Sequence, residues 1–575
     1  MPLISDRFTP LRPLGSHLLL VQDRDATPRV LKRLSDPSHA DPAAVLRLRL
    51  EAWRASQLEG PRFARAYWEP FKTDEPAYYL MSYAEGVPAT LVAPAELQTV
   101  VRELLEALLL LHAKGWVHAS LEPQLLRRTD SGLVVVGYGN LTPIGQAAWR
   151  PGQADYQSPE QAAGLPLDGR ADLFSLGALI HFWMTGEPHT ARLLDASEEP
   201  LGRLALALLA TDPGDRPADA QSVLAQLGET LPATPPALVA PRLPRTRVLA
   251  PIAEALGQGH GLARRLEGSA GAGRSTLLKL ASALAEAADW PVARATAHAG
   301  ALPLAPWQAL VASLEPLART RSPGLLERLQ FRLAPWRHSH DEGLAIPEAT
   351  AVRTRFWDAL AEFLSAIAEP GLVLLLDDWD QADEASRATL QAVQSRLREA
   401  PILWLVAGEH LALEVPPLAL PPLTQDEGVT LVRSALAGRL AEPDAQGLHL
   451  VAEGQPWFLL NLVAYLREAE MLRWNGESWS LRAPASWPVT PEALARLRLA
   501  TLPSAAWQAG MACALLAEPI KAQPLMLVLP ELDTLVAGLD SLLRAGVLRQ
   551  GEGFAFAHPT YREIFREALP PQERP

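Results

Sequence analysis

The clearest hydrophobic patterns in the chain predict buried strands and amphipathic helices. Leu372 to Leu376 (LVLLL) is a continuous apolar run, which suits a strand that is buried on both faces. Pro401 to His410 (PILWLVAGEH) has the same character. Glu96 to Lys114 has the apolar spacing of an amphipathic helix, and Gly115 ends it. These patterns predict a multidomain chain with α+β and α/β parts.

A glycine-rich stretch between a predicted strand and a predicted helix suggests phosphate binding. Residues 262–267 (LARRLE) fit a short strand, and Ser275 to Glu286 have helical apolar spacing. Between them lies GSAGAGRST, residues 268–276, which has the order and spacing of a P-loop. Its glycines permit backbone torsions that let successive amides face phosphate oxygens beside a helix N-terminus: Gly268, Gly271 and Gly273. A flexible Gly/Ala turn is the alternative interpretation.

The end of this stretch carries the side chains expected to meet nucleotide and metal. Ser275 would offer its hydroxyl to Mg²⁺, and Thr276 follows it at the start of the helix. Arg274 stands where the motif normally has lysine. Guanidinium is a broad planar fork rather than a compact point charge, so phosphate binding is expected to survive while hydrolysis is in doubt.

Two carboxylates follow the buried run at Leu372 to Leu376. Asp377 and Asp378 stand where a Walker B strand delivers its acidic residues. Asp377 is expected to hold the metal, and Asp378 to orient the attacking water as a catalytic residue. Together with the glycine loop, they predict a P-loop nucleotide fold.

Length and composition narrow the class of protein. At 575 residues the chain exceeds one core, and 48% hydrophobic with 20% charged residues is ordinary for a globular protein. The net charge of −13 gives a nucleic-acid role no compositional support. The longest near-apolar helix candidate, Leu173 to Met184, is too short to span a membrane, and MPLISDRFTP lacks the features of a signal peptide. With the single Cys513 excluding an internal disulfide, these observations predict a cytoplasmic protein without membrane partners.

Five motifs occur in a fixed order between residues 8 and 228. They are VLK with Lys32, LMSYAEG, YQSPEQ with Glu160, RADLFSLG with Asp172, and DPGDRP with Arg216. This order resembles the bacterial Ser/Thr protein kinases of the eukaryotic type. The resemblance implies a two-lobed fold in which Lys32 pairs with Glu51 and Arg216 pairs with Glu160.

The positions that carry kinase chemistry depart from the family. The catalytic loop reads HASLEPQL, so Ser120 replaces the catalytic base and Leu125 the metal-binding Asn. The Asp-Phe-Gly motif reads Gly137, Tyr138, Gly139. Because serine has no carboxylate, and neither glycine nor leucine can bind a hard cation through its side chain, phosphoryl transfer is not expected. Lys32 and Glu51 then remain either as a structural pair or as part of a metal-independent nucleotide site.

The second half of the chain resembles the STAND class of signalling NTPases, near the AAA-type ATPases. The resemblance rests on LVLLLDDWDQADEAS (residues 372–386) and on AEGQPWFLLNLV (residues 452–463), where Gln455 replaces the usual Asn and Pro456 is kept. It implies a helical lid and a contact between Pro456 and the nucleotide. His410 stands where the family's strand usually ends in Arg, which weakens γ-phosphate sensing.

The C-terminal pattern of helices, a Gly-containing turn and a short alternating hairpin predicts a winged helix. The expected division is a kinase-like domain (1–228), a Pro-rich linker (229–247), a P-loop NTPase core (248–420), a helical lid (421–490) and a winged-helix domain (491–575). The predicted winged helix offers only four arginines for contact with DNA, and acidic residues lie between them in the sequence: Arg544, Arg549, Arg562 and Arg566. Packing as a regulatory lid is therefore favoured over DNA reading.

These inferences together favour a cytoplasmic signalling or scaffold protein. A catalytically inactive kinase-like domain (a pseudokinase) would regulate a STAND-like switch that binds ATP or ADP with Mg²⁺. Protein partners would bind the pseudokinase, and self-association is a further expectation from the STAND resemblance. The alternatives are an enzyme, either an unconventional kinase or a slow ATPase, and a transcription regulator that reads DNA through the winged helix.

Overall fold

The computed structural model describes most of the chain and divides it into two compact units. The described residues are 8–23, 26–34, 41–68, 77–149, 152–190, 199–228, 245–298, 302–329, 332–333, 350–411, 413–436, 439–475, 478–482, 487–488, 490–551 and 553–570. Residues 229–244, most of the predicted linker, lie outside them. One unit comprises Met1–Arg242, Val429–Leu448 and Asn461–Pro575, and the other Leu243–Gly428 and His449–Leu460. One boundary between the units therefore falls in the predicted linker, between residues 242 and 243, and the others fall within the predicted 421–490 segment.

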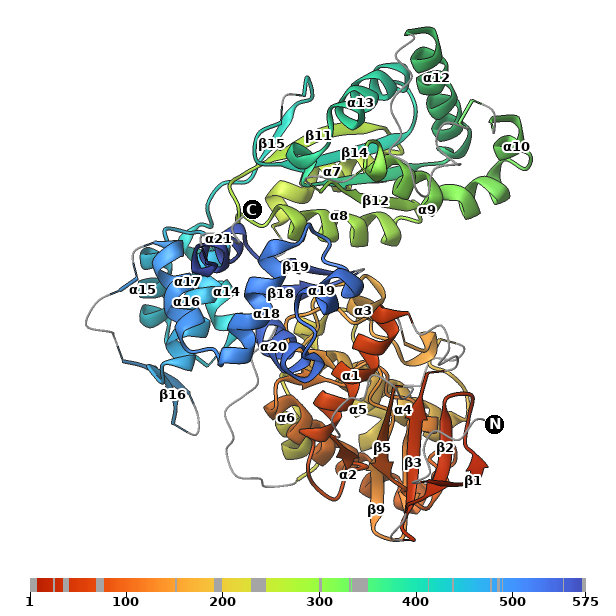
Figure 1. The fold of residues 1–575 in the computed structure, drawn as a ribbon, viewed down its shortest axis with the longest axis vertical. Helices are drawn as coiled ribbons and strands as arrows, with labels where there is room; N and C mark the ends of the chain where they lie inside the picture. The colour runs from red at the N-terminus through yellow and green to blue at the C-terminus, as the bar shows by residue number, and fades with distance from the viewer. Residues whose placement is uncertain are drawn as a thin grey trace. The chain divides into compact units, whose positions relative to one another are not determined.

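The first unit begins with an antiparallel sheet and one helix (Figure 1). The strands run in the order β1-β2-β3-β5-β4, with bounds Thr9–Pro13, Leu18–Gln22, Pro28–Arg33, Tyr78–Ser82 and Ala66–Tyr67. Helix α1 (Pro42–Ser56) lies between β3 and β4 in the chain, and Asp41 caps its first turn by accepting from the Ala43 amide. Lys32 on β3 and Glu51 on α1 are thus carried by neighbouring elements, as predicted.

Helices and short strands follow in the same unit. Helices α2 (Pro94–Ala113) and α4 (Gly169–Thr185) pack together, with α5 (Pro200–Leu208) against α4 and α6 (Ala220–Gln226) against α2. Two small sheets, β6-β8-β9 and β10-β7, flank the catalytic-loop sequence; their strands are Val87–Pro88, Leu126–Thr129, Gly132–Val135, Thr142–Pro143 and Trp116–Val117. The short helix α3 (Pro159–Ala162) begins at its cap Ser158.

The C-terminal part of the first unit is mainly helical. Its helices are α17 (Pro491–Ala500), α18 (Ser504–Leu515), α19 (Ala522–Val528), α20 (Leu532–Arg544) and α21 (Pro559–Ala568). Strands β18 (Leu548–Gln550) and β19 (Phe554–Phe556) form an antiparallel hairpin between α20 and α21. A second hairpin, β16 (Leu472–Trp474) with β17 (Trp479–Leu481), precedes α17.

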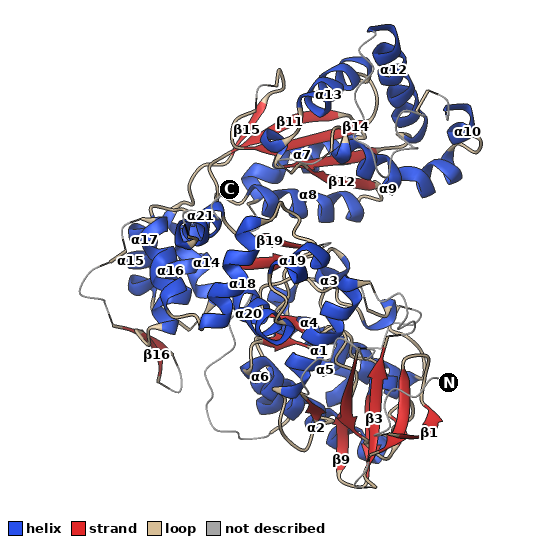
Figure 2. Cartoon of the chain, viewed as in Figure 1, coloured by secondary structure: helices blue, strands red, loops and turns tan. Residues whose placement is uncertain are grey.

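The second unit is built on a parallel sheet with helices around it (Figure 2). The strand order is β12-β13-β14-β11-β15, with bounds Val292–Thr296, Leu372–Asp377, Ile402–Gly408, Leu262–Glu267 and Pro417–Ala419. The predicted strands at residues 262–267 and 372–376 are therefore β11 and β13, and β14 lies between them. Because all pairings are parallel, β11 and β13 end at the same edge of the sheet.

The two faces of this sheet supply two hydrophobic cores. Leu372, Leu374 and Leu376 of β13 pack into one core, while Val373 and Leu375 pack into the other. This alternation explains why the strand reads as a continuous apolar run. The core of Leu372 includes residues of α9 (Ala305–Arg321), α10 (Leu325–Leu329), α12 (Thr350–Ile367) and α13 (Glu384–Arg396); the other includes residues of α7 (Thr246–Gln258) and α8 (Arg274–Ala287).

Three helices follow the sheet in the chain. They are α14 (Gln425–Ala435), α15 (Glu442–Ala452) and α16 (Pro456–Glu468). The turn between α15 and α16 is tight, with Gly454 at φ 71°, and a Cβ there would lie 2.6 Å from the Leu423 carbonyl oxygen. This turn places Pro456 at the first position of α16.

Candidate functional site

The glycine loop joins β11 directly to α8. Gly271 and Gly273 adopt φ values of 83° and 98°, which side-chain-bearing residues rarely take. Gly273 is the N-cap of α8 and makes no side-chain capping bond, so the first amides of the helix have no cap from it. Ser275 and Thr276 occupy the first turn of α8, with Ser275 partly buried and Thr276 exposed. These features fit the phosphate groups of a nucleotide.

Arg274 turns back toward the loop rather than into solvent. Its Nη1 donates to the Gly268 carbonyl at 2.9 Å, and its Nη2 lies 3.7 Å from Asp378 Oδ1. The side chain is only 12% exposed. The residue that replaces the P-loop lysine thus links the loop to the carboxylate after β13.

The two carboxylates at the end of β13 lie in different environments. Asp377 is the last residue of the strand, and its Oδ1 accepts from the Asp378 amide at 3.0 Å. Asp378 follows with φ 48°, and its side chain is 46% exposed. The carboxylates of Asp377 and Asp378 and the hydroxyl of Ser275 offer hard oxygens of the kind that Mg²⁺ prefers. When bound, Mg²⁺ would neutralise phosphate charge; Ser275 and Asp377 are the residues that would hold it.

The segment around Pro456 contacts the glycine loop through its neighbour. The Trp457 amide donates to the Gly271 carbonyl at 3.3 Å. Pro456 therefore lies one residue from a direct contact with the P-loop. His410 is exposed beyond the end of β14, and the neighbouring Glu409 amide donates to Asp380 Oδ1 at 3.1 Å. Trp457 was not singled out from sequence, because a backbone contact leaves no signal in residue type.

In the first unit, the kinase-like ion pair is formed. Lys32 Nζ donates to Glu51 Oε1 at 2.5 Å. Tyr79, on β5, donates its hydroxyl to the same oxygen at 2.7 Å. Burial and the nearby Glu51 carboxylate raise the pKa of Tyr79 well above its ordinary value, so this phenol stays protonated as a donor. Tyr79 is a member of this cluster that sequence reasoning missed.

Leu125 and Gly137, which the kinase resemblance puts at the metal-ligand positions, pack against one another. A Cβ on Gly137 would lie 2.6 Å from Leu125 Cδ2 and 3.0 Å from Leu125 Cδ1. The leucine side chain therefore occupies the space beside Gly137 where a larger side chain would have to begin. Ser120 is partly buried in the loop after Ala119, which has φ 57°. Neither Leu125 nor Gly137 offers a side-chain oxygen to a cation.

The loop that carries Ser120 is held by Asp172. This carboxylate is fully buried and accepts from the His118 amide at 2.8 Å and from the Ala119 amide at 2.9 Å. His112 Nε2 lies 2.9 Å from the same carboxylate. Asp172, from the fourth kinase-like motif, thus makes three contacts that hold this loop and the end of α2 together.

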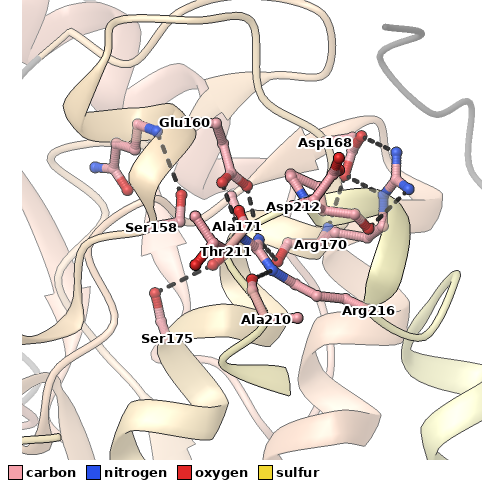
Figure 3. A network of polar contacts seen from close by, with 12 residues as sticks. Ser158, Glu160, Asp168, Arg170, Ala171, Ser175, Ala210, Thr211, Asp212 and Arg216 are labelled. Atoms are coloured by element: carbon pink, nitrogen blue, oxygen red, sulfur yellow. Dashed lines mark hydrogen bonds and ion pairs between the residues drawn. The ribbon is translucent and has the colours of Figure 1, made fainter. Parts of the chain in front are cut away.

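The predicted pair between Glu160 and Arg216 is bidentate and buried (Figure 3). Arg216 Nη1 and Nη2 donate to the two carboxylate oxygens at 2.8 and 2.9 Å. Further donors of Arg216 reach carbonyl oxygens of Ala210, Thr211 and Arg170. Arg170 in turn pairs with Asp168 at 3.0 Å. This network joins α3, the start of α4 and the segment before α6.

Comparisons with known proteins found matches for the N-terminal region and for the region with the glycine loop. Residues 242–405 match the family of the AAA ATPase domain. The serine/threonine-protein kinase pkn3 of Myxococcus xanthus is 29% identical over 241 residues, which cover 34% of this chain and 44% of that protein. PknB of Mycobacterium leprae is 31% identical over 214 residues, covering 32% of this chain and 34% of the relative.

A solved structure also aligns with part of the chain. The kinase domain of Mycobacterium tuberculosis PknI gives a TM-score of 0.32 at 24% identity, over 39% of this chain and 95% of that one. The chain spans less than half the length of the curated relatives it matches. The matches to pkn3 and PknB show that the N-terminal region is homologous to Ser/Thr protein kinases, and an AAA ATPase domain follows it. Among the described residues, no helix has the length and apolar composition needed to cross a membrane.

Proposed function

We propose that this chain is a cytoplasmic signalling protein in which a catalytically inactive kinase-like domain is coupled to an ATP- or ADP-binding switch. The observation that carries the proposal is the contrast between the two nucleotide folds. The kinase-like region has Ser120, Leu125 and Gly137 at the base and metal positions, with Leu125 packed at Gly137. The AAA region keeps a glycine loop, Ser275 and Asp377.

In this proposal the switch is the AAA region with its neighbouring helices. Nucleotide held by the glycine loop, Arg274 and Ser275 would favour one arrangement of the α/β core and the lid over another. The Trp457 contact with Gly271 supports this coupling, because the helix that begins at Pro456 then meets the loop that would hold the phosphates. The helices and hairpin of residues 491–570 serve as a winged-helix regulatory domain, and protein partners bind the kinase-like surface.

The test is the identity of the nucleotide that the purified full chain retains. The protein is denatured, and the released small molecules are separated and identified. ADP or ATP should be present in the wild type and in Lys32→Met, and lost in Ser275→Ala and Asp377→Asn. Retention that survives both P-loop variants and disappears in Lys32→Met would overturn the proposal, because it would assign the nucleotide to the kinase-like cleft.

A slow ATPase is a second candidate, favoured by one observation. Asp378 is half-exposed directly after Asp377, where it could orient water, although Arg274 lies 3.7 Å from it. Phosphate release that exceeds background in the wild type and is lost in Asp378→Ala would establish this activity. Equal release from the two proteins would exclude it.

DNA reading by the C-terminal domain has less support. Each of the four arginines considered for it has an intramolecular partner: Arg544 with Asp540 at 3.0 Å, Arg549 with the Ala557 carbonyl at 2.7 Å, Arg562 with the Leu516 carbonyl at 2.6 Å and Arg566 with the Ala514 carbonyl at 3.1 Å. These contacts compete with phosphate binding. A gel shift at low salt that weakens steeply as salt rises would reinstate this function.

A further inference from the structure

A buried ion pair joins helix α1 of the kinase-like region to helix α20 of the C-terminal region within the same compact unit. Arg54 Nε lies 2.9 Å from Asp540 Oδ1, and the two side chains are 3% and 0% exposed. Arg54 Nη1 also donates to the Leu141 carbonyl at 2.6 Å. A second pair, Arg49 with Asp533 at 2.8 Å, lies five residues earlier on α1 and seven residues earlier on α20, and it is open to solvent on its acidic side.

The chain that follows Gly139 is bound to the C-terminal region as well. Gln146 is buried, and its Nε2 donates to the carbonyl oxygens of Leu543 at 3.0 Å and Leu548 at 2.9 Å. Gln550 Nε2 donates in return to the Ala147 carbonyl at 2.9 Å. These bonds fix the end of α20 and strand β18 against residues 141–149.

An aromatic contact extends the same interface. Trp149 meets Phe554 of β19 edge to face, with ring centroids 6.0 Å apart. The Arg47 guanidinium of α1 lies 5.8 Å from the Trp149 ring. Two segments of the kinase-like region, α1 and residues 141–149, are thus engaged by one continuous surface made of α20 and the β18–β19 hairpin.

The chemistry of the interface indicates a specific contact rather than loose packing. A buried arginine and a buried aspartate each lose their hydration, and they are stable there only while they are paired. Separation of the two regions would return both charges to water, so the contact can open without trapping an isolated buried charge. Because its charged groups can return to water, this interface is of the kind that can form and break within one chain.

The same helix positions the kinase-like ion pair. Glu51 precedes Arg54 by less than one helical turn, and it receives hydrogen bonds from Lys32 and Tyr79. A helix that shifts at Arg54 must also shift at Glu51. The position of α1 relative to β3 thus depends on contacts made on both sides of the helix.

We propose that residues 490–570 are a built-in partner of the kinase-like region, and that the Arg54–Asp540 pair holds α1 in the position where Glu51 meets Lys32. Undocking of the C-terminal region would release α1 and open the kinase-like ion pair. The inference deepens the proposed function, on which it rests, by naming the surface through which the inactive kinase-like domain is coupled to the rest of the chain.

Two intrinsic labels in the full chain allow a direct test. Lys32 is one of few lysines, and its amine is shielded by Glu51, whereas Lys114 is exposed and serves as an internal standard. Cys513, the only cysteine, is fully buried in α18 and reports whether the C-terminal region stays folded. Amine labelling of Lys32 relative to Lys114 and thiol labelling of Cys513 are measured by mass spectrometry without added nucleotide.

In Asp540→Ala, we expect Lys32 labelling to rise by about tenfold or more, because loss of one partner of a buried pair weakens a contact by at least an order of magnitude. Hydrogen exchange of α1 should accelerate in parallel, while Cys513 stays protected. Arg496→Gln is the matched control: it removes exposed pairs with Glu492 of α17 and Glu567 of α21, and it should change neither label. Unchanged Lys32 labelling and α1 exchange in Asp540→Ala would overturn the proposal.

If Asp540→Ala also exposes Cys513, the C-terminal region has unfolded, and Gln146→Ala decides the question instead. That change removes three hydrogen bonds of the Gln146 side chain, to the Leu543 and Leu548 carbonyls and from the Gln550 amide, and leaves the sequence of α20 intact. Faster Lys32 labelling with Cys513 protected supports the proposal, and unchanged labelling refutes it. Neither readout involves nucleotide, so a failed retention experiment and a failed docking experiment are separate results.

Discussion

Restoring the kinase aspartate at Gly137 should destabilise the kinase-like region. Gly137 has φ 85°, and a Cβ there would lie 2.6 and 3.0 Å from the two methyl carbons of Leu125. Cβ atoms do not approach carbon so closely, so Leu125 must move. Overpacking costs about 1–3 kcal/mol, and a left-handed residue other than glycine adds about 1 kcal/mol. We therefore expect Gly137→Asp to lower the local free energy of unfolding by about 2–4 kcal/mol.

The second half of this prediction is that Leu125→Asn relieves most of the packing cost. The planar amide of Asn is less bulky than the two methyl groups of Leu and leaves more room for the aspartate, so the two substitutions should couple favourably by about 1–3 kcal/mol. The remaining cost in the double variant is the backbone strain at φ 85°, which Leu125 does not influence.

Hydrogen exchange of α2 and α4 amides measures this effect in the full chain. A global unfolding curve would mix several regions that need not unfold together. Gly139→Ala is the matched control, because a Cβ there would lie 3.4 Å from Lys32 Nζ and 3.5 Å from Glu51 Oε2, which is near ordinary contact. If Gly137→Asp lowers the local free energy of unfolding by the same amount with and without Leu125→Asn, the Leu125 side chain does not occupy the space that an aspartate needs. That result would refute the reasoning.

Three further predictions concern buried groups. Arg216→Ala should lower the local stability of the helices around α4 by about 3–5 kcal/mol, because it leaves the Glu160 carboxylate buried and unpaired; exchange of α3 and α4 amides measures the loss, and a loss below about 1 kcal/mol would contradict it. Burial lowers the pKa of His118, so its neutral ring stabilises the fold at pH above the unfolded value of 6.5, and that stability falls as pH drops through the window below it. His118→Leu should therefore reduce the slope of stability against pH just below 6.5 by up to about 1.4 kcal/mol per unit, and an unchanged slope would exclude a folded-state shift. Burial raises the pKa of the Cys513 thiol, so Ellman's reagent should label it at pH 8 only at the rate at which α18 opens, which added denaturant should increase; prompt labelling in the native protein would refute the burial of this thiol.

Much of the local structure was predictable because it follows from short-range pattern. The apolar run at Leu372 to Leu376 became β13, since both faces of a central parallel strand are covered. The glycine loop and α8 formed where the P-loop spacing placed them. The order of kinase motifs likewise predicted the pairs Lys32–Glu51 and Arg216–Glu160.

Long-range contacts could not be predicted in the same way. Arg54 and Asp540 are 486 residues apart in the chain, and nothing in the residues around either one names its partner. Arg498 is a similar case: buried in α17, it donates to Glu468 at 2.8 Å and to the Ala545 carbonyl at 2.7 Å. An arginine on a helix usually indicates a solvated face, and only tertiary packing reverses that expectation. The position of β14 between β11 and β13 is likewise set by tertiary packing and not by the local sequence.

In the kinase-like region, the conformation of the loop that carries Ser120 does not depend on the side chain at that position. The loop is held by backbone amides of His118 and Ala119 on the buried carboxylate of Asp172, and none of these bonds involves the side chain at Ser120. A serine can therefore stand at the position of the catalytic base without loss of the loop's conformation. Leu125 and Gly137, which the kinase resemblance puts at the metal-ligand positions, are also packed together, since the leucine side chain fills the space beside the glycine. The conformation of this loop therefore does not require a carboxylate at position 120, which is consistent with the proposed role of the region as a binding domain.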